Sequence, residues 1–324
     1  MSAHDVLVVA EVQRQALADI TLELLAAARG VAEAGGGQVI CLVLSADGTP
    51  FVPALAPADR IVLVNDPQLA DYAPDPFVAA AFEVVAAEQP RAVLVAGTSV
   101  GWDLAPLLAS RLQAPLVTGC KSVTADGPGL VVDVSFCGGK MMAEVAVGQS
   151  PAVLMIMPGS YRAATAAGAA RVETREPASP LPAGAVRFRE WVLPEAGDVD
   201  ITQQDVLVAV GRGIQQKDNV ELAEQLAQAL GGAVCASRPA VDQGWLPATR
   251  QVGKSGMTVR PKLYLALGVS GAPEHLEGMD GSELIIAVNT DPKAPIFDAA
   301  HYGAEVDALD LLPALVEAVG AKKG

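Results

Sequence analysis

The chain has 324 residues, of which 51% are hydrophobic and 18% charged, with a formal net charge of −15. This composition excludes a disordered chain, because disorder combines low hydrophobicity with high charge, and the length indicates roughly two domains. The acidic balance argues against nucleic acid or an anionic membrane as a partner, and no apolar run has the roughly 18 residues that a membrane-spanning helix needs.

The first part of the chain alternates strand and helix patterns. Their near-continuous apolar runs are typical of strands buried on both faces, and the alternation predicts a parallel sheet. Buried strands are predicted at residues 5–10, 38–44, 60–64 and 91–96, and helices at residues 20–34 and 77–87.

The pattern changes after residue 115. Strands predicted at 131–136 and 142–147 follow at close spacing with glycines between them, which indicates an antiparallel excursion at the edge of the first sheet. Residues 163–185 are rich in Ala, Pro and charge and show no persistent period, so we interpret them as an excursion or linker.

A second α/β unit begins at Asp205. Strands are predicted at 205–210, 263–267 and 284–288, and a helix from about residue 218. The sequence therefore predicts an α/β protein of two domains, each a mostly parallel sheet flanked by helices. The predicted boundaries are 1–187 for the first domain, 188–204 for a linker and 205–324 for the second domain.

Four cysteines, Cys41, Cys120, Cys137 and Cys235, stand far apart in a chain with only three histidines. A zinc or iron–sulfur site needs clustered ligands, so no metal is expected. Scattered thiols are typical of a reducing cytosol, and no basic region precedes the first apolar run, so no secretory signal is expected. These features favour a cytoplasmic protein of bacterial type.

Residue types suited to function gather between 211 and 307, mostly directly after strands. Open parallel sheets bind ligands at the carboxyl ends of their strands. The glycines of residues 268–272 either cradle a phosphate with backbone N–H groups or form a tight connection. Together with 211–213, 251–256 and 289–291, this loop predicts a cationic, amide-lined seat for an extended dinucleotide.

Two other motifs compete with this prediction. Gly253-Lys254-Ser255 is not a P-loop, because the spacing needs glycine where Ala248 stands and no apolar strand leads into it. A serine hydrolase is a remote alternative: Gly268-x-Ser270-x-Ala272 is a loosened nucleophile elbow, and Ser270, Asp291 or Asp298, and His301 follow in the order of that fold.

Three further side chains are candidates by position. Arg212 and Arg238 each follow a short apolar strand, where a guanidinium can clamp a phosphate or neutralise a reduced ring. His275 lies on the helix predicted just after Ser270. Taken singly, each arginine is better explained by a surface ion pair, and His275 by a structural role.

Five segments occur in order along the second unit: Val210–Gly213, Ala236–Trp245, Gln251–Gly256, Leu267–Leu276 and Asn289–Phe297. Together they resemble one family, the alpha subunit of electron transfer flavoproteins (the FixB family). The resemblance is dense over residues 205–319 and looser in the first domain, where it rests on strand–helix order and on Gly97–Gly101 with the helix behind it.

The resemblance implies that the second domain is a doubly wound, DHS-like Rossmannoid domain that holds FAD. Carried over by position, Arg238 would face the isoalloxazine ring and Ser255 would place its hydroxyl near flavin N5. His275 would donate toward the N1/C2 carbonyl edge. A guanidinium and an imidazole there would stabilise the negative charge that reduction places on the ring.

The remaining contacts implied by the resemblance lie on the other half of the cofactor. The amides of Ser270–Ala272 would hold the pyrophosphate, with Asn289 and Asp307 on the adenosine side. The complete implied set is Arg212, Ser237, Arg238, Gln251, Val252, Gly253, Lys254, Ser255, Ser270, Gly271, Ala272, Pro273, Glu274, His275, Asn289 and Asp307.

The resemblance also implies a heterodimer with a beta subunit. Electrons would pass from flavoprotein dehydrogenases, such as the acyl-CoA dehydrogenases of fatty acid β-oxidation, to a quinone-linked acceptor of the ETF-quinone oxidoreductase type. The chain would carry electrons and turn over no substrate of its own. An electron-bifurcating version stays open, in which NADH drives ferredoxin reduction and the beta subunit holds a second FAD.

Two positions depart from the family pattern, which commonly has Gln where this chain has Lys254 and Glu274. An added cation and an added anion near a flavin would alter its potential or pair with each other. We hypothesise that the two departures compensate.

Overall fold

The computed structural model describes residues 4–137, 141–165, 168–191 and 199–323. The chain divides into two compact units, Met1–Glu190 and Trp191–Gly324. The predicted linker 188–204 falls at this division, and its residues 192–198 lie outside the described part. Ile201 is buried in the core of the second unit, so the chain packs with that unit before its first strand begins.

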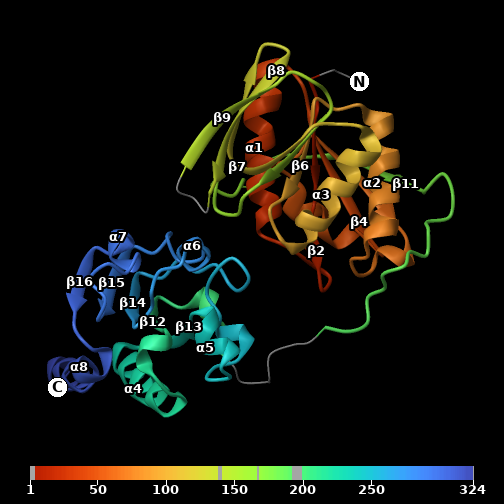
Figure 1. Cartoon of the computed structure of the whole chain (residues 1–324). Helices are drawn as coiled ribbons and strands as arrows, with labels where there is room; N and C mark the ends of the chain where they lie inside the picture. The colour runs from red at the N-terminus through yellow and green to blue at the C-terminus, as the bar shows by residue number, and fades with distance from the viewer. Residues whose placement is uncertain (1–3, 138–140, 166–167, 192–198, 324) are drawn as a thin grey trace. The chain divides into compact units, whose positions relative to one another are not determined.

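The first unit is built on one nine-stranded sheet (Figure 1). The strand order is β11-β5-β4-β1-β6-β10-β7-β8-β9, parallel from β11 to β7 and antiparallel from β7 to β9. The antiparallel excursion predicted at the sheet edge is confirmed. The strands are β1 (Val6–Val9), β4 (Val39–Ser45), β5 (Arg60–Asn65), β6 (Ala92–Ala96), β7 (Leu116–Asp126), β8 (Gly129–Phe136), β9 (Met141–Val147), β10 (Ala152–Ile156) and β11 (Arg171–Arg175), and a separate ladder pairs β2 (Val12–Gln13) with β3 (Ala16–Leu17).

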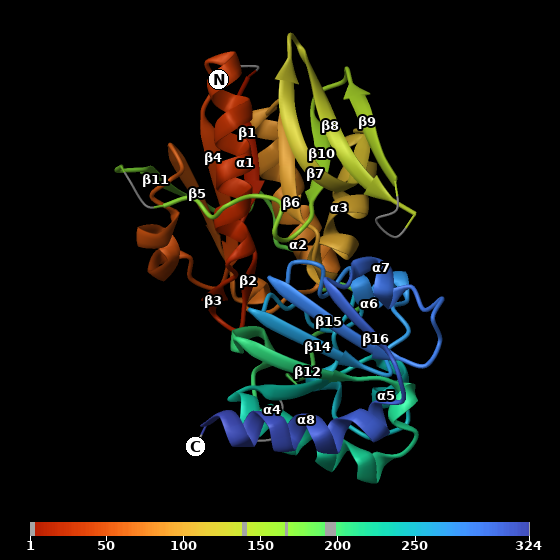
Figure 2. The ribbon, with the colours of Figure 1, turned by 90° about the vertical axis from the view of Figure 1, so that its left-hand side faces the viewer.

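Both faces of this sheet are covered. In β1, Val6 and Val8 lie in the core on one face, and Leu7 and Val9 in the core on the other. Figure 2 shows α1 on the near face, with α2 and α3 beyond the sheet. The helices are α1 (Ile20–Gly35), α2 (Pro74–Glu88) and α3 (Ser99–Leu112), with the 3-10 helices η1 (Thr49–Leu55) and η2 (Pro67–Leu69).

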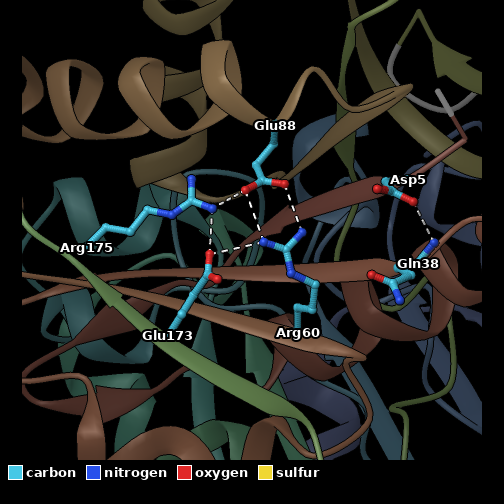
Figure 3. Close-up of polar contacts among 6 residues, drawn as sticks. All are labelled: Asp5, Gln38, Arg60, Glu88, Glu173 and Arg175. Carbon is cyan, nitrogen blue, oxygen red and sulfur yellow. Dashed lines mark hydrogen bonds and ion pairs between the residues drawn. The ribbon is translucent and has the colours of Figure 1, made fainter. Parts of the chain in front are cut away.

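The segment 163–185, interpreted from its sequence as an excursion or linker, contains the edge strand β11, which pairs in parallel with β5. Charged side chains join this strand to its neighbours (Figure 3). The buried carboxylate of Glu88 on α2 forms ion pairs with Arg60 at 2.9 Å and with Arg175, and Glu173 forms ion pairs with the same two arginines. The strand was missed because an ion network with distant residues stabilises it and no apolar run of its own marks it.

The second unit contains a five-stranded parallel sheet in the order β13-β12-β14-β15-β16. Helices α4 and α8 pack together on one face. The strands are β12 (Val206–Val210), β13 (Ala233–Ala236), β14 (Leu263–Leu267), β15 (Leu284–Asn289) and β16 (Tyr302–Glu305); the helices are α4 (Val220–Leu230), α5 (Arg238–Asp242), α6 (Pro273–Leu276), α7 (Ile296–Ala299) and α8 (Ala308–Lys323), with the 3-10 helices η3 (Ile201–Gln203), η4 (Arg212–Ile214), η5 (Lys217–Asn219) and η6 (Ala248–Arg250).

The connections of the second sheet create a switch point. From β12 the chain moves to β13 on one side and then to β14 on the other, so the loops after these strands diverge at the carboxyl edge. Ligands bind in the crevice at such a point. Across the described residues, no helix combines the length and the apolar character needed to span a membrane.

Candidate functional site

A cavity of about 660 Å³ opens at the carboxyl edge of the second sheet. The loops that follow β12, β13, β14 and β15 line it, together with residues 251–255. This volume lies within the range of roughly 300–1,000 Å³ that small-molecule and cofactor sites occupy. The switch point of the sheet is therefore hollowed in the way that a ligand site requires.

Two of these loops touch through glycines. The N–H of Gly213 donates to the carbonyl of Gly268 over 3.1 Å, and a Cβ on Gly213 would lie 2.6 Å from the Cα of Gly268. Gly268 has φ +61°, in the left-handed region that favours glycine. Both glycines line the cavity, so the close approach of these two backbones shapes this part of the cavity wall.

The turn after β14 is held by its carbonyl groups. Asn289 donates its side-chain N–H to the carbonyl of Val269 at 2.8 Å, and the N–H of Ile296 donates to the carbonyl of Ser270 at 3.1 Å. Within the described ranges, the N–H groups of Ser270, Gly271 and Ala272 have no hydrogen-bond partner. Successive free N–H groups in a concave turn are suited to an anion.

Residues 251–255 form the opposite wall. Gln251 is buried and donates its amide N–H to the hydroxyl oxygen of Ser255 at 2.9 Å. The backbone N–H of Lys254 donates to the carbonyl of Glu274 at 2.7 Å, and its ammonium lies 3.6 Å from the carboxylate of Glu277. This wall is thus joined to helix α6.

His275 on α6 is the buried titratable group of the cavity. Its Nδ1 lies 3.1 Å from the carbonyl oxygen of Val252 and its Nε2 lies 2.9 Å from the hydroxyl of Tyr264. Burial lowers the pKa of His275 to about 4, against an opposing effect of the hydrogen bond to Val252. The imidazole is therefore neutral at physiological pH, with both nitrogens in contact with protein groups.

The charge of the wall differs from the sequence prediction. Arg212, Arg238 and Lys254 line the cavity, and so do three carboxylates, those of Asp242, Glu274 and Asp291. Arg238 is largely exposed, and its Nε lies 3.5 Å from Asp242. The expectation of a cationic seat is wrong, because three carboxylates line the same wall as the three cations: Glu274 and Asp291 already lay in the predicted segments, and the tertiary structure adds Asp242. The amide lining is present.

Most of the predicted site residues lie together. Of the sixteen residues implied by the resemblance, all but Pro273 and Asp307 line the cavity. Asp307 instead accepts the N–H of Leu309 at 2.9 Å, at the start of α8. The cavity residues outside the predicted set are Gly213, Pro239, Asp242, Gly268, Val269, Asp291, Ala294 and Pro295. Gly213, Gly268 and Asp291 belong to the loops 211–213, 268–272 and 289–291, which the sequence placed at the seat. Asp242 and Ala294 lie within the segments that carry the resemblance but were not assigned a contact.

The residues of the hydrolase alternative do not form a triad. Ser270 and Asp291 line the cavity, but His301 and Asp298 do not. The Nδ1 of His301 accepts the backbone N–H of Ile285 at 3.0 Å, and the described contacts include no hydrogen bond between that ring and Ser270. A serine nucleophile needs a base within hydrogen-bond reach, so the hydrolase interpretation is not supported.

The donor set suits FAD, the cofactor that the resemblance implies. A diphosphate needs hydrogen-bond donors, which the free amides of Ser270–Ala272 and the guanidinium of Arg212 provide. An isoalloxazine ring needs polar groups along one edge and a wall to pack on, which Ser255 and the 251–255 loop offer. The residues present therefore fit the group.

Comparison with known proteins agrees with this chemistry. Residues 6–180 match the electron transfer flavoprotein domain, and residues 200–280 match the electron transfer flavoprotein FAD-binding domain. The chain is 37% identical to the electron transfer flavoprotein subunit alpha of Methylophilus methylotrophus over 94% of its length and 96% of the relative. It is 35% identical to protein FixB of Azotobacter vinelandii, covering 97% of this chain and 90% of the relative.

A third relative carries a different name. It is the acryloyl-CoA reductase electron transfer subunit beta of Anaerotignum propionicum, 32% identical over 98% of this chain and 96% of that protein. Each match extends over both units and nearly the whole relative. The chain therefore belongs to the family of electron transfer flavoprotein alpha subunits, and its second unit is the FAD-binding domain of that family.

Proposed function

We propose that this chain holds FAD in the cavity of its second unit. In this role it carries electrons from flavoprotein dehydrogenases, such as acyl-CoA dehydrogenases of fatty acid β-oxidation, to a quinone-linked acceptor and turns over no substrate itself. The observation that carries the proposal is the turn Ser270–Ala272. Its free backbone N–H groups can donate hydrogen bonds to a diphosphate, and the turn lies in the part of the chain that matches the FAD-binding domain of the family.

Different residues of the cavity contact the two halves of the cofactor. The amides of Ser270–Ala272 and the guanidinium of Arg212 hold the diphosphate, and Arg238 and the 251–255 loop lie along the ring system. When bound, FAD supplies the one- and two-electron chemistry, whereas the protein supplies binding, orientation and electrostatics. Arg238 stabilises the negative charge that the ring gains on reduction, and the partly exposed site makes this contribution modest.

Members of this family generally pair with a beta subunit, and we propose that this chain forms such a heterodimer. The flavin content of the purified pair separates the two kinds of electron carrier. One FAD per heterodimer supports the dehydrogenase-to-quinone carrier. Two FAD per heterodimer support the electron-bifurcating version, with NADH and ferredoxin as its partners.

The experiment on the site itself is a pair of glycine variants in the co-expressed heterodimer. A Cβ on Gly271 would lie 2.2 Å from the backbone nitrogen of Ile296, so Gly271→Ala displaces the turn. Gly244 also has a positive φ, +71°, but nothing lies within 4 Å of its added Cβ, and it does not line the cavity. Gly271→Ala should lose the flavin absorption band and Gly244→Ala should keep it. Equal flavin content in both variants would count against the proposed site.

A further inference from the structure

The tautomer of His275 follows from its two partners. The Val252 carbonyl, 3.1 Å from Nδ1, can only accept a hydrogen bond, so Nδ1 carries the hydrogen. In the neutral ring Nε2 is then an acceptor, and the hydroxyl of Tyr264, 2.9 Å away, is the donor. Each nitrogen of the ring is thus satisfied in one way only.

The Tyr264 hydroxyl contacts His275 and is not exposed to solvent. It lies in the central strand β14 with an exposed fraction of 0%, on the core face shared with Cys235 and Val252. Its one hydroxyl hydrogen goes to His275, and the thiol of Cys235, 4.0 Å away, donates to the hydroxyl oxygen. Among the described contacts, Nε2 of His275 is the stronger acceptor for this hydroxyl, since the sulfur of Cys235 accepts hydrogen bonds only weakly.

We propose that Tyr264 is a positioning residue: by donating to Nε2 it holds the neutral His275 ring on the cavity wall in the orientation that keeps the Nδ1 hydrogen on Val252. The ring nitrogen that could turn to a ligand, Nε2, is occupied by the Tyr264 hydroxyl. To donate from Nε2 while Nδ1 stays on Val252, His275 must leave Tyr264 and take up one proton. Tyr264 therefore keeps Nε2 from donating to a ligand unless His275 changes both its partner and its protonation state. This last step rests on the proposed function.

Other titratable groups lie on the elements packed against the ring. Lys254 belongs to the 251–255 wall, Glu274 to α6, Glu277 to the C-cap of α6, and Cys235 to β13. The variants below leave Lys254 and both glutamates unchanged, so a change in the His275 signals reports on Tyr264.

The direct test is nitrogen NMR of the histidine rings in the full chain without cofactor. The chain has only three histidines, His4, His275 and His301. Wild-type His275 should show a protonated Nδ1 and an unprotonated Nε2, unchanged from pH 8 to pH 5. His301 is the internal control with the opposite tautomer, because its Nδ1 accepts the N–H of Ile285. An Nε2-protonated His275 in the wild type would overturn the proposal whatever the variants do.

Two variants then separate hydrogen bonding from packing. Tyr264→Phe removes the donor and keeps the ring, so the His275 signals should shift and its titration should move to higher pH. Cys235→Ala disturbs the other side of the same hydroxyl and should leave the His275 signals as in the wild type. The proposal fails if Tyr264→Phe leaves them unchanged, or if Cys235→Ala shifts them equally.

The flavin-loaded heterodimer gives a second readout. The pH dependence of the flavin reduction potential should differ between the wild type and Tyr264→Phe, and should be the same in Cys235→Ala. The two proposals fail separately. A heterodimer that binds no FAD overturns the proposed function while the NMR result stands, and an unperturbed His275 in Tyr264→Phe overturns this inference in a protein that binds FAD normally.

Discussion

The side-chain amide of Gln251 donates to the hydroxyl oxygen of Ser255 at 2.9 Å, from a buried position beneath the cavity wall. Because that oxygen already accepts a hydrogen bond, the hydroxyl hydrogen of Ser255 is available to an acceptor in the cavity. The two residues therefore form a unit in which Gln251 orients the group that a ligand meets.

Removal of the Gln251 or the Ser255 side chain should weaken FAD binding, because each substitution removes the hydrogen bond that the oriented Ser255 hydroxyl makes to the cofactor. We expect Gln251→Ala and Ser255→Ala each to cost about 1 kcal/mol, the net value of one hydrogen bond. The double variant should cost less than the sum of the two, because the second substitution removes an interaction that is already lost. FAD dissociation constants from fluorescence titration measure this, and additive costs would show that the two side chains act independently.

Reversal of the amide gives a matched control. Gln251→Glu keeps the shape of the side chain but offers only acceptors, so the Ser255 hydroxyl should turn to the carboxylate and away from the cavity. Its FAD affinity should fall at least as far as that of Ser255→Ala. An affinity equal to the wild type would contradict the orienting role of Gln251.

Two costs of a side chain at Gly268 can be measured separately: the steric clash of its Cβ with Gly213 and the strain of a positive φ. Gly268 and Gly231 both have positive φ, +61° and +77°, but an added Cβ at Gly268 meets Gly213 at 2.6 Å and one at Gly231 meets nothing within 4 Å. Gly231→Ala should cost about 1 kcal/mol of stability for the left-handed backbone, and Gly268→Ala distinctly more. Urea unfolding of the full chain measures both, and only Gly268→Ala should also lose FAD.

The ion network around Glu88 should stabilise the first unit. Glu88 is 1% exposed and pairs with Arg60 and Arg175, so Glu88→Gln leaves two cations with one carboxylate and should cost about 3 kcal/mol. Denaturant unfolding measures the cost. Asp205→Asn, in an exposed ion pair with Lys262, is the control and should change little.

This contribution should depend on pH in a defined direction. Burial raises the pKa of Glu88, but hydrogen bonds and charges from Arg60 and Arg175 outweigh it, and the net pKa is lowered. A carboxyl with a lowered folded-state pKa contributes its full stability above its unfolded pKa of about 4.3 and loses it as the pH falls through the folded value. The stability difference between wild type and Glu88→Gln should therefore be constant from pH 8 to pH 5 and narrow below pH 4. A difference that persists at low pH would contradict the ionised state of Glu88.

The two departures from the family pattern can be tested together. Lys254→Gln removes a cation from the wall and should lower the flavin potential, and Glu274→Gln removes an anion and should raise it, each by no more than about 1 kcal/mol. If the two side chains pair, each substitution should shift the potential less when the partner has already been removed, so the double variant should differ from the sum of the two single shifts. Potentiometry of the three variants measures this; strictly additive shifts would rule the pairing out.

Much of the fold was predictable, because strands buried on both faces have continuous apolar runs. The runs around Val6, Val93 and Leu265 indicated central parallel strands, and all three belong to such strands. The strand Arg171–Arg175 was not predictable, since its stability comes from pairing with β5 and from Glu88, residues distant in the sequence. A local pattern cannot record a partner of that kind.

The sequence by itself determined the two α/β units, the family and most residues of the cavity wall, because glycines and polar side chains directly after buried strands must gather at one sheet edge. Only the tertiary structure decided the electrostatics of that wall. Asp242 joins the arginines there, and burial keeps His275 neutral while its two ring nitrogens contact Val252 and Tyr264. The physical reason is that charge balance and tautomer depend on which groups meet in space, at distances and burials that no residue order specifies.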